Sequence, residues 1–386
     1  MLKGKFRREV RMDDSLRGGM GMDKERRQAL GIFLAVTALA CNYSPLVRQA
    51  IRIPSAQADV AASAKAYEGR MLIPGGQAVG VALRTQGVLV VAKGGRIEGT
   101  ERIESKSPLR VGDVIEQVQG RQVRSAAELS ERIGAWPQEQ VELGVLRRGR
   151  RMTLEVSLPT GTDGRRRLGV WVRDSTAGVG TLSYIDPVSG AYGALGHAIV
   201  DGDTGDLLPV ADGAILSASV VGVIKGQSGQ AGELKGSFLK ENEQIGTLAL
   251  NSEYGIYGCL EETPADALYP RGLPVGTREM AHPGRASILS TVDGEGVKEY
   301  SVEILRCFDQ SKPSQKGMVL RVTDERLLEK TGGIVQGMSG SPILQDGRII
   351  GAVTHVYLSD AAQGYGMYIE WMLERSDALS ALDQAA

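Results

Sequence analysis

The sequence contains few cysteines, few histidines and few aromatic residues. Among its 386 residues are 3 cysteines, 3 histidines and 5% aromatic residues. No group of these cysteines and histidines has the spacing of zinc ligands, so we expect neither a metal site nor a cofactor. Cys41 lies in a segment of targeting character, and no spacing between Cys259 and Cys307 requires them to form a disulfide.

The chain also has almost no net charge and no long hydrophobic run. Its formal net charge is -1, which provides no positive field to attract nucleic acid, and we exclude nucleic acid as a partner. The longest N-terminal apolar run covers residues 29–41, whereas a membrane-spanning helix needs about 20 apolar residues. Because the basic stretch 24–27 precedes it, residues 1–46 are predicted to be a polar lead followed by a signal peptide or signal anchor. The protein is therefore expected to be exported across the cytoplasmic membrane. An amphipathic helix packed on the core is the alternative, and Thr37 is the one polar residue that would support it.

Glycine is abundant, and its distribution indicates short strands joined by tight turns. The chain has 51 glycines, and its length is typical of two folded units plus a tail. Residues 47–70 are rich in alanine, glutamine and serine, which predicts a linker. Residues 71–160 and 161–386 are predicted to be the two domains, both of them mainly β.

The first domain has the sequence features of a peptide-binding module. Two short apolar strands are followed by a turn with Gly112 and Asp113, and Ser125 opens a predicted helix. This pattern resembles a PDZ domain of the kind found in bacterial proteases. The resemblance implies that an extended peptide adds as a strand, and the matching residues are Gly76, Gln77, Ala78 and Val79. A packing module without a ligand is the alternative.

In the second domain, Gly337-Met338-Ser339-Gly340-Ser341-Pro342 is the segment most indicative of chemistry. A serine between glycines can lie on a tight turn, where the N–H groups of Gly337 and Ser339 converge on an oxyanion. A plain β-turn would explain the same string. We predict that Ser339 is a nucleophile.

A serine nucleophile needs a base, and the chain offers His197, His282 and His355. Small residues surround His197 and leave space for a substrate, so His197 is the predicted base. His282 is expected in a loop, and His355 in the substrate cleft or in packing. The residues alone do not choose the carboxylate that orients the imidazole; the candidates are Asp324, Asp201, Asp203 and Asp206.

The segment 331–343, together with His197, Asp324 and the leading PDZ-like pattern, resembles the stage IV sporulation protein B serine peptidase family. The resemblance spans nearly the whole chain and places the catalytic serine, histidine and aspartate at Ser339, His197 and Asp324. The Gly-x-Ser-Gly-x-Pro element is similar to that of chymotrypsin-like proteases. The short separation between Asp324 and Ser339 departs from those enzymes. The expected fold is thus an α+β PDZ domain followed by a chymotrypsin-like β-barrel peptidase domain.

The same resemblance implies a regulatory protease of endospore formation. Such a protein is exported into the space between the two forespore membranes. There it cuts itself and a membrane-associated regulatory protein that controls sigma-factor processing. The alternative function is a non-catalytic PDZ adaptor whose second domain is a degenerate protease fold used for binding.

Overall fold

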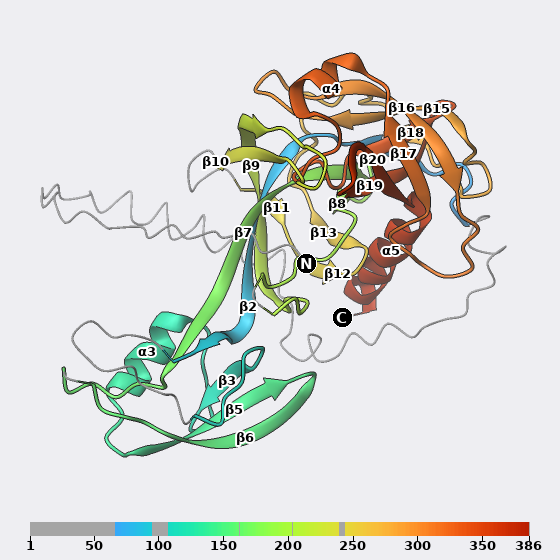
Figure 1. The fold of residues 1–386 in the computed structure, drawn as a ribbon. Coiled ribbons are helices and arrows are strands. Elements are labelled where there is room, and N and C mark those ends of the chain that lie inside the picture. The colour runs from blue at the N-terminus through green and yellow to red at the C-terminus, as the bar shows by residue number, and fades with distance from the viewer. Residues whose placement is uncertain (1–65, 95–106, 162, 203, 239–243, 386) are drawn as a thin grey trace, which may run out of the picture. The chain divides into compact units, whose positions relative to one another are not determined.

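The described part of the chain is mainly β, as the glycine-rich pattern predicts. The computed structural model describes residues 66–94, 107–161, 163–202, 204–238 and 244–385 (Figure 1). The predicted lead, signal segment and most of the linker lie outside these residues. The contacts discussed below join residues between 66 and 379, which belong to one compact unit.

Fourteen of the described strands form one extended sheet. Its main path runs β12-β13-β8-β7-β2-β3-β5-β6, and the other six strands pair alongside it. The bounds are β1 (Met71–Pro74), β2 (Ala78–Lys93), β3 (Val114–Val118), β4 (Arg121–Gln122), β5 (Gln140–Arg147), β6 (Arg150–Ser157), β7 (Val170–Ile185), β8 (Ala191–Ala194), β9 (Val210–Ile224), β10 (Glu233–Phe238), β11 (Gln244–Thr247), β12 (Leu250–Ser252), β13 (Gly255–Cys259) and β14 (Leu273–Pro274).

The six remaining strands close into a barrel in the order β15-β16-β17-β20-β19-β18. These strands are β15 (Gly284–Ser290), β16 (Lys298–Cys307), β17 (Met318–Val322), β18 (Pro342–Gln345), β19 (Arg348–Tyr357) and β20 (Asp360–Tyr368). Alternate strand residues such as Val302 and Ile304 are buried in its core, as the two-residue side-chain period of a strand requires. Helix α4 (Glu325–Thr331) follows β17, and α5 (Ile369–Ala385) follows β20.

A separate hydrophobic core identifies the PDZ-like part of the chain. It runs from Val88 in β2 to Leu168, with Leu129 and Ile133 of helix α3 (Ala126–Gly134) packed inside it. Ser125 caps α3 by accepting the N–H of Glu128, as its place before the predicted helix indicates.

The predicted turn at Gly112 and Asp113 is confirmed. Gly112 has a φ of 90°, which favours glycine. The carboxylate of Asp113 accepts the N–H of Arg110 at 2.7 Å. Asp113 is buried, and its charge is balanced by Arg147 at 2.7 Å.

The first half of β2, which lies within the predicted domain 71–160, packs in another core than the PDZ-like part. Ala78 pairs with Thr181 of β7, and Val79 pairs both with Gly180 of β7 and with Ser217 of β9. Since β7 and β9 flank this half of β2, its backbone has no free edge for an added peptide strand. The predicted strand addition beside Val79 therefore has no room, and peptide binding by Gly76, Gln77 and Ala78 stays a prediction.

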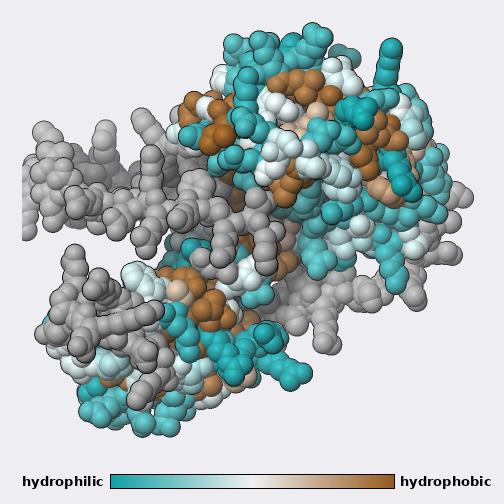
Figure 2. Space-filling model, in the orientation of Figure 1, coloured by the Kyte–Doolittle hydropathy of each residue, from teal (hydrophilic) through white to brown (hydrophobic). Residues whose placement is uncertain are grey.

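The mainly β fold class is confirmed, with a PDZ-like unit ahead of a closed barrel. On the face shown in Figure 2, hydrophobic side chains occur in groups among hydrophilic ones, as is ordinary for a folded protein. None of the helices in the described ranges combines the length and apolar character of a membrane span. Cys259 is exposed and Cys307 is partly buried, and neither forms a disulfide.

Candidate active site

Ser339 lies on a tight turn between α4 and β18. Within this turn Met338 donates to the carbonyl of Val335 at 3.1 Å, and Ser341 donates to that of Met338 at 3.0 Å. Gly340 has a φ of 99°, and a Cβ at this position would lie 2.1 Å from the carbonyl oxygen of Thr181. A larger residue cannot fit there. The glycine of the motif is thus required by the close approach of β7.

Two backbone N–H groups of the turn are left without protein acceptors. Among the hydrogen bonds made by the described residues, none uses the N–H of Gly337 or of Ser339. The peptide group between them is fixed instead, because Thr181 donates its hydroxyl to the carbonyl of Gly337 at 2.7 Å. Two fixed and unengaged N–H groups on either side of one residue are what an oxyanion site requires.

The hydroxyl of Ser339 is bound to the backbone in this structure. Its Oγ donates to the carbonyl oxygen of Thr354 in β19 at 3.0 Å. In the described part of the chain no hydrogen bond joins Ser339 to a histidine. The hydroxyl must therefore leave the Thr354 carbonyl before a base can take its proton.

His197 follows β8 and is brought close to the serine turn by a compact backbone. Leu195 and Gly196 both have a φ of 68°. A Cβ on Gly340 would lie 2.6 Å from the N of Leu195, and a Cβ on Gly196 would lie 3.1 Å from the Cγ2 of Thr354. Just before His197, Leu195 thus approaches the Ser339 turn and Gly196 approaches β19.

The imidazole of His197 is held as a neutral base. Its Nδ1 lies 2.9 Å from the carbonyl oxygen of Ala198, and because a carbonyl only accepts, Nδ1 carries the proton and Nε2 keeps its lone pair. Burial lowers the pKa of His197, an effect that the Ala198 carbonyl opposes more weakly. The ring is therefore neutral at neutral pH.

His355 lies beside His197, with ring centroids 5.9 Å apart and planes at 45°. Its Nδ1 is buried without a hydrogen-bond partner among the described residues. Burial, and then the nearby charges of His197 and Lys316, lower the pKa of His355 to about 4. By contrast, His282 is exposed in a loop, where its Nε2 lies 2.9 Å from Asp346.

Asp324 is not joined to His197 by any hydrogen bond of the described residues. Its carboxylate caps α4, accepts the N–H of Ser301 at 3.2 Å and pairs with Arg326 at 2.7 Å. The hydrogen bonds and charge of Arg326 lower the pKa of Asp324 to about 2. Its assignment as the third catalytic residue has no supporting contact here and stays a prediction.

Two of the alternative carboxylates, Asp201 and Asp206, lie in the described part of the chain. Asp201 is buried and pairs with Arg173 at 2.7 Å, and it also accepts the N–H of Thr204. Asp206 is exposed. Asp203 lies outside the described residues.

Two residues that position the site were not identified from the sequence. Besides Thr181, which holds Gly337, the buried Asn251 clamps the segment after His197. Its amide donates to the carbonyls of Ile199 at 2.8 Å and Leu208 at 2.9 Å, and its oxygen accepts the N–H of Ile199. A lone threonine or asparagine far from a motif carries no chemical pattern, so only the fold identifies them.

The described residues contain no group of three or more histidine, cysteine, aspartate or glutamate side chains that could hold a metal ion. The chemistry available at this site is that of an alcohol, an imidazole and two backbone N–H groups. This combination is suited to acyl transfer.

Comparison with protein families agrees with this chemistry. A family model described as SpoIVB peptidase S55 matches residues 164–373. The chain belongs to this family. As a SpoIVB-family peptidase it is a serine endopeptidase, and the matched region contains both His197 and Ser339. No curated protein matches the chain.

Among solved structures, the SpoIVB-family chain is similar to several others at low identity. The PDZ domain of the SdrC-like protein from Listeria monocytogenes is 17% identical, with a TM-score of 0.19, and the match covers 22% of this chain and 87% of that one. The Rv3671c protease from M. tuberculosis, in its active form, is 16% identical with a TM-score of 0.30, covering 53% and 74%. The thermostable serine protease AL20 from an extremophilic microorganism is 12% identical with a TM-score of 0.31, covering 58% and 94%.

Proposed function

We propose that Ser339 is the nucleophile and His197 the general base of this endopeptidase. The Oγ of Ser339 attacks the carbonyl carbon of the scissile peptide bond, and its proton passes to Nε2 of His197. The N–H groups of Gly337 and Ser339 receive the oxyanion. The protonated His197 then gives its proton to the leaving amine, and water hydrolyses the acyl-enzyme by the same steps in reverse.

The observation that carries this proposal is the pair of unengaged N–H groups at Gly337 and Ser339. Gly337 and Ser339 are both partly exposed, so their N–H groups can reach a bound substrate. The Thr181 hydrogen bond holds the peptide group between them in place. The carbonyl of Thr354 now accepts the Ser339 hydroxyl. When substrate binds, it is free to accept a substrate N–H instead.

The orienting group of the imidazole is the Ala198 carbonyl in the resting structure. A carboxylate would stabilise the imidazolium cation better than a carbonyl does. The family resemblance gives that role to Asp324, which would require movement of the α4 N-terminus and loss of the Arg326 pair.

We further propose a regulatory role in endospore formation, which the family name supports. In this role the protein is exported across the cytoplasmic membrane and cleaves itself as well as a membrane-associated regulator of sigma-factor processing. The sequence that follows Val47 is rich in alanine, glutamine and serine, a composition typical of linkers that proteases cut.

The experiment compares the parent protein with Ser339→Ala after expression and purification under the same conditions. A new N-terminus between Val47 and Glu68 is expected in the parent and absent from Ser339→Ala. The same new N-terminus in both proteins would show that another protease trims the linker. It would remove self-cleavage from the proposal.

A further inference from the structure

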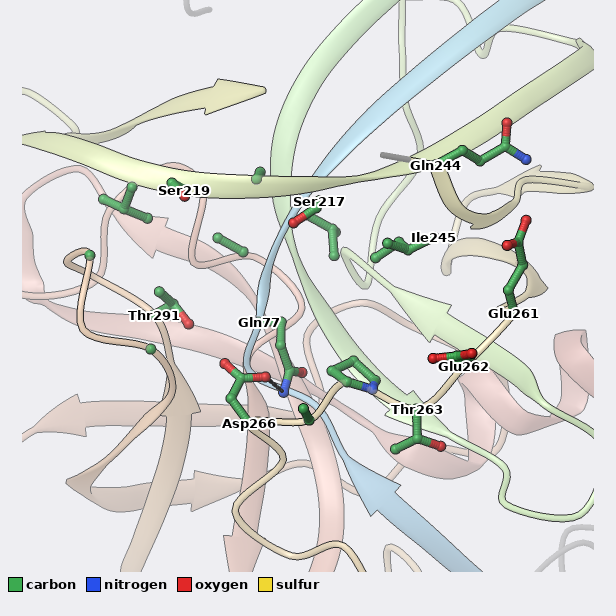
Figure 3. A pocket seen from close by; sticks show the side chains of 18 of the residues that line it. Gln77, Ser217, Ser219, Gln244, Ile245, Glu261, Glu262, Thr263, Asp266 and Thr291 are labelled. Atoms are coloured by element: carbon green, nitrogen blue, oxygen red, sulfur yellow. Dashed lines mark hydrogen bonds between the residues drawn. The ribbon is translucent and has the colours of Figure 1, made fainter. Parts of the chain in front are cut away.

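A cavity of about 620 Å³ lies apart from the serine and histidines, and Figure 3 shows its lining. It is formed by residues 77–79 at the start of β2, by 217–220 of β9, by the start of β11, and by the loops 261–266 and 291–296. Neither Ser339 nor His197 lines it. Its volume is in the range of pockets that bind organic ligands.

The charged side chains that line this cavity in the described ranges are acidic. These residues are Glu261, Glu262, Asp266 and Asp293, and no described lysine, arginine or histidine lines the cavity with them. Asp293 is already neutralised by Lys298 and Lys330. The other three form no ion pair with any residue that the structure describes. The cavity therefore keeps three uncompensated carboxylates, which favour a cation.

Gln77 adds an uncharged hydrogen-bond acceptor that lacks a donor. Its side chain is only 8% exposed, and its Nε2 donates to Asp266 at 3.0 Å, as the dashed line in Figure 3 shows. Its amide oxygen is buried and has no hydrogen-bond partner among the described residues. A buried acceptor without a donor is costly, and a small rotation of the side chain towards the cavity would let a ligand N–H satisfy it.

The ligand must supply both positive charge and several N–H donors. A bare metal ion is a poor fit, because no group of three or more acidic, histidine or cysteine side chains in the described ranges is close enough to hold one. A guanidinium group has a delocalised charge and five N–H donors in one plane. It can bind the oxygen of Gln77 and a neighbouring carboxylate at once.

We propose that this acidic cavity binds an arginine-containing segment of the protein substrate, outside the catalytic centre. One strand pair connects the lining of the cavity to the nucleophile. Ala78 of its lining pairs with Thr181, and the N–H of Thr181 donates to the carbonyl of Ser339 at 3.1 Å. A long substrate can occupy both places. This link to cleavage rests on the proposed function, whereas binding in the cavity does not.

Binding is tested with the full-length Ser339→Ala protein and a fluorescein-labelled peptide, acetyl-Ala-Arg-Ala-Arg-Ala-amide, by fluorescence anisotropy. The matched probe replaces both arginines with glutamine. The arginine peptide is expected to bind at least about tenfold more tightly at low salt, and this advantage should shrink at high salt because exposed charges are screened.

Variants then assign the binding to this cavity. Glu262→Gln combined with Asp266→Asn should weaken binding of the arginine peptide about tenfold. Gln77→Met should weaken binding without changing its salt dependence. Glu329→Gln makes the same chemical change at an exposed carboxylate outside the cavity, and it should leave the affinity unchanged. Thermal unfolding of each variant checks that it is folded.

Equal affinity for the arginine and glutamine peptides would overturn the proposal. So would an unchanged affinity in the folded double variant. These outcomes are independent of catalysis, because the binding protein carries Ser339→Ala throughout. A protein that binds the arginine peptide as described but whose parent cleaves nothing would instead contradict the proposed function alone.

Discussion

The hydroxyl of Thr181 donates a hydrogen bond of 2.7 Å to the carbonyl oxygen of Gly337, from a residue 156 positions away in the sequence. A peptide group is planar, so fixing this carbonyl also fixes the direction of the Met338 N–H, which donates to Val335. The protein thus holds both the carbonyl and the N–H of this peptide group. The neighbouring N–H groups of Gly337 and Ser339 stay open to a substrate oxyanion.

The first prediction concerns this contact. Thr181→Val keeps the shape of the buried side chain but removes its hydroxyl, so the oxyanion donors lose their fixed direction. We expect kcat for cleavage of labelled casein to fall about ten- to hundredfold, somewhat less than for removal of a donor itself, with little change in KM. Thr153→Val, on an exposed strand position, is the matched control. Equal kcat in the two variants would contradict this role of Thr181.

The second prediction concerns Asp324. Asp324→Asn can still cap α4 but loses the charge pair with Arg326, and we expect the free energy of unfolding to fall by about 1 kcal/mol. Because the pKa of Asp324 is lowered to about 2, its stabilising effect is present above its ordinary pKa near 4 and is lost as the pH falls towards 2. Unfolding measured between pH 5 and pH 2 should therefore show less acid dependence in the variant. A loss of kcat above about hundredfold at unchanged stability would instead support the predicted triad role.

The third prediction concerns pH. The base must be unprotonated to act, and burial lowers the pKa of His197 below the ordinary histidine value near 6.5. The acid limb of kcat/KM should therefore have its midpoint below pH 6.5, and activity should fall as the pH falls through that midpoint. His282→Asn changes an exposed histidine in another loop and should not move the midpoint. A midpoint above pH 6.5 would mean that His197 gains a carboxylate partner in the active enzyme.

The fourth prediction concerns Asn251. Asn251→Ala removes three hydrogen bonds and leaves the N–H of Ile199 and the carbonyl of Leu208 without partners, whereas the carbonyl of Ile199 keeps the N–H of Leu208. We expect the free energy of unfolding to fall by about 2 kcal/mol and the segment 199–208 to become more sensitive to limited proteolysis. An unchanged proteolysis pattern would show that the loop after His197 is held by other contacts.

The tight turn at Ser339 could be predicted from the sequence because it has a distinctive local pattern. The glycines around Ser339 are required by close backbone approach and by positive φ at Gly337 and Gly340, and such requirements leave a mark on the sequence. The Gly112 turn and the Ser125 helix cap are local in the same sense. Their geometry depends on residues only a few positions away.

Contacts between distant segments could not be predicted in this way. The apolar run at Val79 has the composition of a strand in any sheet, and only the pairing with β7 and β9 shows that it lies outside the PDZ-like core. The sequence around Asp324 suits a catalytic aspartate as well as a helix cap. Its partner Arg326 is a neighbour in sequence, yet nothing in the spacing alone distinguishes the two roles.

The most direct test of the catalytic assignment is covalent labelling of the full-length protein with a serine-directed fluorophosphonate, followed by peptide mass spectrometry. We predict that Ser339 is the modified serine in the parent. In His197→Ala its labelling should slow by about hundredfold or more, because the base that takes the hydroxyl proton is gone. Labelling of Ser341 or another serine in place of Ser339, or an equal rate with and without His197, would contradict the assignment.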